Sequence, residues 1–277
     1  MSLGEILEAL AGLRRLGMCA VSLDGGEPLI HEDIDAVVRW LSERGVLLRI
    51  NTNGVLIGRH TETIRHMSKV KISLDGPPSV HDAVRGQGSF WRAVRGAQIA
   101  RELGCNVEFT CVVGPHNVDR VDDLLGIAQR LGAPVVFQPL RWSLIDGPRT
   151  LPAECGSRVR QAFLRLEELK RAGAPVGNRW SSLKHFRRWP DDEPLPCAAG
   201  WINATLDPEG NLFACAQTDR SGVKNNVIEL GAEEAFRRLC RAGCRQCWCA
   251  RVVEENYAWG CRADAFLPPI AAAGGAR

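Results

Sequence analysis

A regular alternation of strand-like and helix-like segments over the first half of the chain restricts the fold most. Five short, mainly apolar runs alternate with segments in which apolar residues recur at helical spacing. Four of the helical segments end at a glycine directly before the next strand, as helices commonly do. The alternation predicts right-handed βαβ units and a parallel sheet in an α/β fold, either open or curled into a barrel. The five runs are 18–24, 46–50, 70–74, 107–113 and 135–139.

The helical segments have recognisable starts. Ser2 and Glu5 have the spacing of a capping box, so the first element is expected to be a helix that stops at Gly17. Further helices are expected at about 31–44, 89–103, 118–131 and 157–172, whereas 79–90 is expected to form a loop. Residues 178–196 are predicted to be a linker with a short helix, in which Trp180, Phe186 and Trp189 pack on the core.

Polar and small residues gather where the five strands end. Taken singly, each is more typical of a turn or a cap. Because the carboxyl ends of parallel strands share one face, five such ends together predict a binding site on that face. The residues are Gly25, Gly26 and Glu27, then Asn51 and Asn53, Ser73 and Asp75, Thr110, and Gln138.

Two groups of side chains near these strand ends allow more than one interpretation. His81, Asp82 and Arg85 could hold the anionic end of a ligand, or form a solvated loop with a local Asp82–Arg85 pair. The other histidines have no spacing that suggests a metal site and are expected at the surface or at caps. They are His31, His60, His66, His116 and His185.

Charge and hydropathy exclude some partners. The 277 residues carry a formal net charge of +3, both signs are interspersed, and no long basic run is present. This pattern argues against nucleic acid and against an anionic membrane surface as partners. No apolar stretch is long enough to span a bilayer and no secretory signal precedes the first helix, so we expect a cytoplasmic protein.

Eleven cysteines are many for a chain without export signals, and a disulfide framework is not expected in a reducing compartment. Seven of them lie after residue 196, which marks a second module. We therefore expect a barrel core at 1–150, a helical linker at 151–196, a cysteine-rich module of a β-hairpin and a helix at 197–265, and a disordered tail at 266–277. The seven are Cys197, Cys215, Cys240, Cys244, Cys247, Cys249 and Cys261.

The second module has the spacing of a metal centre. A hairpin over 201–215 is expected to bring Cys197 and Cys215 together, and a Cys-x-x-Cys pair supplies Cys244 and Cys247. Four thiolates suit zinc and a [4Fe-4S] cluster equally, and a redox dithiol is a further interpretation of the pair. Any of Cys240, Cys249 and Cys261 could replace one of these ligands or help to hold a second centre. Inert cysteines are the alternative.

Taken together, these motifs resemble those of radical S-adenosylmethionine (radical SAM) enzymes with a carboxyl-terminal SPASM or twitch domain. The resemblance extends over residues 2–261. It rests on Gly25-Gly26-Glu27-Pro28, Thr52-Asn53-Gly54, Ser73-Leu74-Asp75-Gly76 with His81-Asp82 and Arg85-Gly86, and the terminal cysteines.

The resemblance implies a partial (β/α)6 barrel whose strand ends bind S-adenosylmethionine. Gly25, Gly26 and Glu27 would meet the methionine amino group, with Asn51, Asn53 and Arg85 among the cofactor-binding residues. Ser73 and Asp75 would lie near the ribose or substrate, and Thr110 and Gln138 would face the adenine or methionine side. Cys197, Cys215, Cys244 and Cys247 would hold an auxiliary [4Fe-4S] cluster, which decides against zinc by analogy.

In such enzymes a reduced [4Fe-4S] cluster cleaves S-adenosylmethionine, and the resulting 5′-deoxyadenosyl radical abstracts a substrate hydrogen. The substrate would be a peptide, a cofactor precursor or a small metabolite. An electron donor such as a flavodoxin or ferredoxin would reduce the cluster.

The sequence departs from the family at one motif. The family's Cys-x-x-x-Cys-x-x-Cys loop follows the first barrel strand, and neither that strand nor that loop precedes the Gly25-Gly26 segment here, where Cys19 stands alone. We therefore expect the catalytic cluster only in an intact parent protein, of which this chain would be a fragment that leaves a sheet edge open near Val21. The alternative is a non-catalytic iron–sulfur or partner-binding protein derived from the family.

Overall fold

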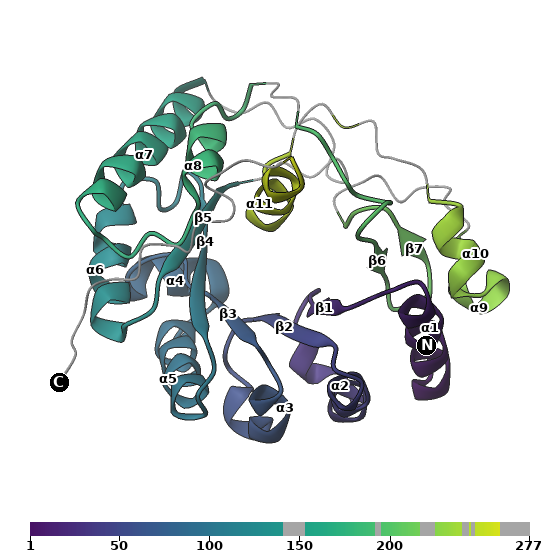
Figure 1. The fold of residues 1–277 in the computed structure, drawn as a ribbon. Coiled ribbons are helices and arrows are strands. Elements are labelled where there is room, and N and C mark those ends of the chain that lie inside the picture. The colour runs from purple at the N-terminus through teal and green to yellow at the C-terminus, as the bar shows by residue number, and fades with distance from the viewer. Residues whose placement is uncertain (141–152, 192–194, 217–224, 240–243, 245–246, 261–277) are drawn as a thin grey trace.

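A computed structural model describes residues 1–140, 153–191, 195–216, 225–239, 244 and 247–260 of the chain. Five parallel strands form one sheet in sequence order: β1 (Ala20–Leu23), β2 (Leu47–Thr52), β3 (Lys69–Ser73), β4 (Val107–Val113) and β5 (Val135–Pro139). The sheet curves without closing on itself (Figure 1). The predicted α/β class and partial parallel barrel are thus confirmed. Within the described residues β1 pairs only with β2, so it forms an open edge.

Helices follow the strands and cover the outer side of the sheet (Figure 1). A capping box between Ser2 and Glu5 begins the first helix, as predicted. The elements are α1 (Leu3–Arg15), α2 (Ile34–Glu43), α3 (Thr61–Arg65), α4 (Pro78–Arg85), α5 (Ser89–Glu102), α6 (Val121–Leu131) and α7 (Ala153–Arg171), with short 3-10 turns η1 (Pro28–Ile30) and η2 (Ile57–Arg59).

The prediction of a loop at 79–90 is wrong, because helix α4 occupies most of this segment. Pro78 stands in the first turn of α4, where its fixed φ favours a helix and its missing N–H is not needed. Asp82 then accepts hydrogen bonds from the backbone N–H groups of Gly88 (2.7 Å) and Phe90 (2.8 Å) and so fastens the start of α5. The expected Asp82–Arg85 pair does not form; Arg85 pairs with Asp75 instead.

The two faces of the sheet differ in chemistry. Side chains alternate between the faces along each strand. One set, which includes Ile50, Ile72 and Phe109, is fully buried against the outer helices and forms the main core. Apart from the exposed Leu47, the opposite set on β2 and β3 is polar or charged and only partly buried. The inner side of the curve is therefore available for binding, because the core is complete without it.

The segment after α7 joins the main core. Helix α8 (Trp180–Phe186) confirms the short helix predicted in this linker, and Phe186 and Trp189 are buried as expected. His185 was expected at the surface, which is wrong: it is 2% exposed. It occupies a core-facing position of α8 and is held there by polar partners described below.

The cysteine-rich part is small and contacts the amino-terminal helix. It contains the hairpin β6 (Thr205–Leu206) and β7 (Leu212–Phe213), then α9 (Val227–Leu230), α10 (Ala232–Arg237) and α11 (Ala250–Trp259). The hairpin has the predicted turn but shorter strands, and α11 was not predicted. The expected tail at 266–277 lies outside the described residues. None of the described helices combines the length and the apolar character needed to cross a bilayer.

Contacts between α1 and this module are close. The Met1 ammonium donates to the Pro208 carbonyl (2.8 Å), and Arg15 Nε lies 2.8 Å from Glu233 Oε1. Between these two points Gly12 approaches α10 so closely that a Cβ there would lie 2.7 Å from the Cβ of Ala232. Figure 1 shows α1 beside α9 and α10, at the open-edge end of the sheet. The amino-terminal helix therefore packs against the hairpin turn and α10 of the cysteine-rich part.

Candidate active site at the strand ends

Glu27 is held rigidly at the carboxyl ends of β1 and β2. Its carboxylate accepts hydrogen bonds from the Asn53 backbone N–H (2.7 Å), the Thr52 hydroxyl (2.8 Å) and the Leu29 backbone N–H (3.2 Å). An ionised carboxylate has about four acceptor positions, so these three donors leave roughly one for a ligand. Glu27 is thus a fixed, partly exposed acceptor.

The two glycines before Glu27 leave open space. Gly25 has a φ of 125°, a conformation that glycine adopts without strain. A Cβ placed at Gly25 or at Gly26 would meet nothing within 4 Å. The backbone of this loop is therefore exposed beside the Glu27 carboxylate, and a bound group can approach it closely. This arrangement suits a ligand that carries an ammonium group.

Asn51 and Asn53 lie next to this loop, as predicted. The Asn51 amide donates to the Asp24 carboxylate, which ties the ends of β1 and β2 together. The Asn53 side chain accepts from the Val55 N–H (2.8 Å), while its backbone N–H is the one that binds Glu27. Both asparagines therefore support the loop that carries Glu27.

Asp75 is buried and bound by neighbouring protein groups. It is 2% exposed, and its carboxylate pairs with Arg85 and accepts from the Val112 N–H (3.4 Å). His81 is buried beside it and accepts from the Asp75 N–H (3.2 Å). Burial lowers the pKa of His81, which keeps the ring neutral and able to accept. Of the Asp75–Arg85 pair, Arg85 is the member that reaches solvent, with a side chain 32% exposed.

Ser73, Thr110 and Gln138 complete the predicted set. Ser73 and Thr110 are register partners on the inner side of β3 and β4, and both are partly buried. Gln138 lies at the end of β5 and its Oε1 accepts from the Ala250 N–H (3.0 Å). The Gln138 side chain thus fixes the start of α11 against the sheet, a contact that local sequence patterns do not reveal.

Three cysteines of the carboxyl-terminal part lie near Cys247. Burial raises the pKa of the Cys247 thiol to about 12, and the neighbouring Cys249, Cys215 and Cys197 add to the rise. Cys244, which the sequence pairs with Cys247, is exposed and does not contribute. Cys240 and Cys261 lie outside the described residues. Cys249, Cys215 and Cys197 therefore lie close enough to Cys247 to influence its pKa, and the ligand set stays a prediction.

These thiols are near one another but are not arranged as a finished metal site. Within the described ranges, no three His, Cys, Asp or Glu side chains are placed to hold one metal ion. The electrostatic effect on Cys247 reaches further than a coordination bond, which reconciles the two observations. The donor set of soft thiols fits iron or zinc, and metal binding would have to displace the thiol protons.

His185 supports this cysteine group and was missed by the sequence analysis. Its Nε2 lies 2.7 Å from the Cys247 carbonyl, and the Tyr257 hydroxyl lies 3.4 Å from its Nδ1. The ring also packs on Trp248, with centroids 4.9 Å apart. The apolar residues of α8, Trp180, Leu183 and Phe186, are not three or four positions from His185, so this helix carries no periodic signal for its burial.

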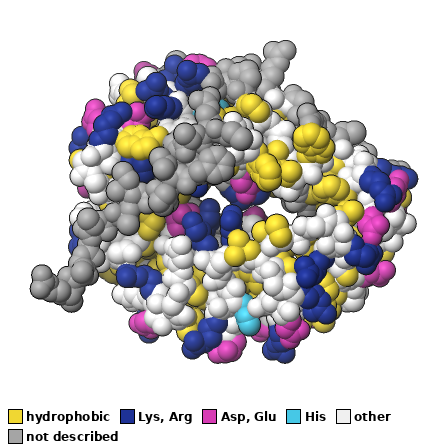
Figure 2. All heavy atoms as spheres, in the orientation of Figure 1, with side chains coloured by type: hydrophobic (Ala, Val, Ile, Leu, Met, Phe, Trp, Pro, Cys, Tyr) yellow, Lys and Arg dark blue, Asp and Glu magenta, His cyan; other side chains and the backbone are white. Residues whose placement is uncertain are grey.

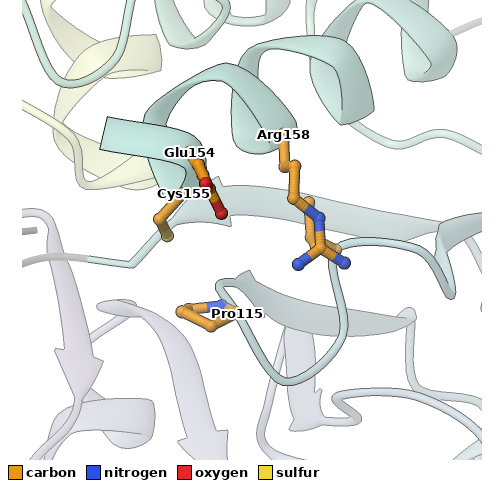
Figure 3. A pocket seen from close by; sticks show the side chains of 5 residues that line it. Pro115, Glu154, Cys155 and Arg158 are labelled. Atoms are coloured by element: carbon orange, nitrogen blue, oxygen red, sulfur yellow. The ribbon is translucent and has the colours of Figure 1, made fainter. Parts of the chain in front are cut away.

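A small cavity lies beyond the end of β4. Its volume is about 200 Å³, below the roughly 300–1,000 Å³ usual for ligand pockets. Figure 3 shows the Cys155 sulfur and the Arg158 guanidinium on opposite sides of this cavity, with Pro115 beneath them. Arg158 is paired with Asp119. The cavity is lined by Pro115, Val118, Glu154, Cys155 and Arg158.

The curved parallel sheet and the Glu27 loop agree with the class of protein that the comparisons indicate. Residues 1–128 match the family model of the radical SAM superfamily, a family of enzymes. The solved structure of Streptococcus suis SuiB has a similar fold, with a TM-score of 0.66 and 15% identity, over 84% of this chain and 58% of that one. The match over residues 1–128 supports the resemblance inferred from the motifs, whereas the SPASM or twitch assignment stays a prediction.

Among curated relatives, mycofactocin maturase MftC of Mycobacterium ulcerans is 27% identical over 268 residues, which cover 86% of this chain and 66% of MftC. The PqqA peptide cyclase of Rhodopseudomonas palustris is 26% identical over 96% of this chain and 75% of its own length. The chain spans 56% to 66% of the MftC relatives that it matches.

Proposed function

We propose that this chain is a radical SAM protein whose strand-end face binds S-adenosylmethionine for the modification of a peptide. The fixed Glu27 carboxylate beside the open Gly25-Gly26 backbone is the observation that carries the proposal. Two relatives are named for maturation or peptide cyclisation. The fold also resembles SuiB in structures with S-adenosylmethionine and with the precursor peptide SuiA, at TM-scores of 0.62 and 0.59. A cofactor precursor or small metabolite is the other substrate class.

The residues of this chain would bind and orient the cofactor. The free acceptor position of Glu27 takes one N–H of the methionine ammonium, and Gly25 and Gly26 let it approach. Ser73 and Thr110 offer hydroxyl groups to the ribose or adenine from the next strand ends. Asn51 and Asn53 hold the loop in place, and Arg85, anchored by Asp75, is a cation that could meet the carboxylate of the cofactor.

S-adenosylmethionine supplies radical chemistry when a reduced [4Fe-4S] cluster lies beside it. No Cys-x-x-x-Cys-x-x-Cys precedes the Gly25-Gly26 segment, and the one stretch of the sequence with that spacing, Cys240 to Cys247, lies in the cysteine-rich part. The strand-end residues are therefore assigned binding and orientation only. A flavodoxin or ferredoxin remains the proposed electron donor for a complete enzyme.

We further propose that Cys197, Cys215 and Cys247 hold an auxiliary [4Fe-4S] cluster, with Cys249 as the fourth ligand in place of Cys244. The support is the thiol group around Cys247 and the exposure of Cys244. His185 would position this site through the Cys247 carbonyl.

Anaerobic reconstitution with iron and sulfide tests the ligand set. The protein should retain close to four irons per chain, Cys249→Ser should lose most of the bound iron and sulfide, and Cys244→Ser should retain both. Cys19→Ser is the matched control, because Cys19 is an exposed cysteine far along the chain from this group. Iron loss in the Cys244 variant with retention in the Cys249 variant would restore the ligand set that the Cys-x-x-Cys spacing predicts. Zinc instead of iron would exclude the cluster.

A further inference from the structure

The inner face of the sheet carries a group of basic side chains below the cofactor loop. Arg49 and Lys69 are register partners on β2 and β3, and Lys71 follows two residues later on the same face. Glu108 on β4 is the register partner of Lys71. These four side chains form what we name the inner charge group. Figure 2 shows Lys or Arg side chains around the central hollow of the molecule, where this inner face lies.

The inner charge group has more cations than anions. Lys69 Nζ lies 3.0 Å from Glu108 Oε2 and Lys71 Nζ lies 3.2 Å from Glu108 Oε1, so one carboxylate serves two ammonium groups. Arg49 has no ion pair with any residue in the described part of the chain. Three cations therefore face one anion. The side chains of Glu108 and Lys71 are 8% and 16% exposed, so water screens this imbalance only in part.

Charges from the other elements do not remove the excess. Glu254 of α11 faces Glu108 and Lys71, but Lys170 is a further cation beside it, and its carboxylate accepts from the Arg179 N–H (3.0 Å) and the Ser182 hydroxyl (3.2 Å). Arg251 and Glu255 of the same helix pair with each other at 3.1 Å. Asp24 is the remaining acid near the inner charge group. It accepts a hydrogen bond from the Asn51 amide and interacts with the charge of Arg251. The surplus positive charge stays on the sheet.

We propose that Arg49, Lys69 and Lys71 bind a carboxylate group of the substrate, so that the substrate is an acidic peptide or a peptide carboxyl terminus. This inference rests on the proposed function and names the substrate chemistry of the same site. Partly buried cations that lack a counter-ion are costly, and an Arg or Lys hydrogen bond to a carboxylate is among the strong ones.

The depth of the inner charge group suits such an anchor. Arg49 and Lys69 each stand four positions before the strand-end residues Asn53 and Ser73. At roughly 3.3 Å per residue, the Cα atoms of Arg49 and Lys69 lie about 13 Å below the strand ends, and that of Lys71 lies about 7 Å below them. A carboxylate bound there leaves several bonds of substrate between the anchor and the strand ends. The anchored substrate can therefore present another of its atoms to the cofactor.

A pair of small probes tests this without a known substrate. Glutarate carries carboxylates and glutaramide is its neutral counterpart of the same shape. NMR titration of the full chain, up to tens of millimolar, should show glutarate binding at least about tenfold more tightly than glutaramide, as expected for hydrogen bonds to charged groups. No glutarate binding, equal binding of the two probes, or tighter binding of inorganic phosphate than of glutarate would overturn the proposal.

Three variants locate the binding. Arg49→Met should weaken glutarate binding about tenfold, and it leaves no anion without a partner. Glu108→Gln should strengthen glutarate binding, because it releases both lysines. Lys184→Met, at an exposed position of α8, should change nothing and is the matched control. An unchanged affinity in Arg49→Met, with an unchanged melting temperature, contradicts the assignment.

The result is independent of the proposed cofactor site. Binding of S-adenosylmethionine is measured on the same variants by calorimetry. Loss of the glutarate preference with cofactor binding retained refutes only the carboxylate anchor. Absence of cofactor binding with the preference retained refutes only the proposed function.

Discussion

Replacing Glu27 by glutamine is the sharpest test of the cofactor loop. The substitution keeps the size of the side chain and removes its charge. One oxygen becomes an NH2 group, which cannot accept a hydrogen bond. Because the two carboxylate oxygens together accept three hydrogen bonds, either orientation of the amide places a donor against a donor. The variant therefore loses an internal contact and the acceptor for the cofactor ammonium together.

The magnitude follows from the energy of hydrogen bonds to charged groups, about 1.5–3 kcal/mol each. Loss of the ammonium contact should weaken S-adenosylmethionine binding by about 10- to 150-fold. Loss of the bond from the Asn53 N–H, which measures 2.7 Å, should also lower the free energy of unfolding by about 1–3 kcal/mol.

Isothermal titration calorimetry under anaerobic conditions measures the affinity, and urea denaturation measures the stability. Thr52→Val separates the two effects, because it removes one support of Glu27 and leaves the charge. It should weaken cofactor binding less than Glu27→Gln does. Glu32→Gln, an exposed acid on the same connection, is the matched control. If Glu27→Gln binds S-adenosylmethionine as tightly as the wild type does, Glu27 is not the ammonium site.

Two further predictions concern the packing of the carboxyl-terminal part. Gly12→Ala should reduce the free energy of unfolding by about 1–3 kcal/mol relative to Gly4→Ala, because a Cβ fits freely at Gly4 and collides with Ala232 at Gly12; equal urea midpoints would contradict the close contact. Burial raises the pKa of Glu254, so its contribution is fully present below the unfolded-state pKa of about 4.3 and is lost as the pH rises through the folded-state pKa. The stability of the wild type relative to Glu254→Gln should therefore fall with rising pH above about 4.3, and a constant difference would refute this.

The sheet could be predicted because its strands and helix ends are marked by residues that lie close together in the sequence. Each strand is a short apolar run, and helices such as α1 begin and end at recognisable residues, Ser2 and Gly17 among them. The Glu27 loop was found for the same reason, since paired glycines and an acid at a strand end are visible in one segment. The donors that fix Glu27 are less visible, because two of them come from β2 and the residue after it.

Elements with polar residues in buried positions escaped prediction. Helix α4 carries His81 in the core, and α11 carries Asn256, which is 3% exposed and accepts from the Ala198 N–H. Such residues interrupt the apolar period that indicates a helix. The partner of the Asn256 oxygen, the Ala198 N–H, lies 58 residues away in the sequence, so no local pattern reveals it.

The sheet has an apolar outer face and a polar inner face, and this division affects how proteins with this fold can evolve new binding specificities. Ile50 and Ile72 on the outer face secure the sheet, while their inward neighbours Arg49 and Lys71 make little of the hydrophobic core. Substitutions on the inner face therefore change what is bound at a small cost in folding. Descendants of one ancestral sheet could acquire new substrates by exchanging a few inward residues, with the framework that positions the cofactor left as it was.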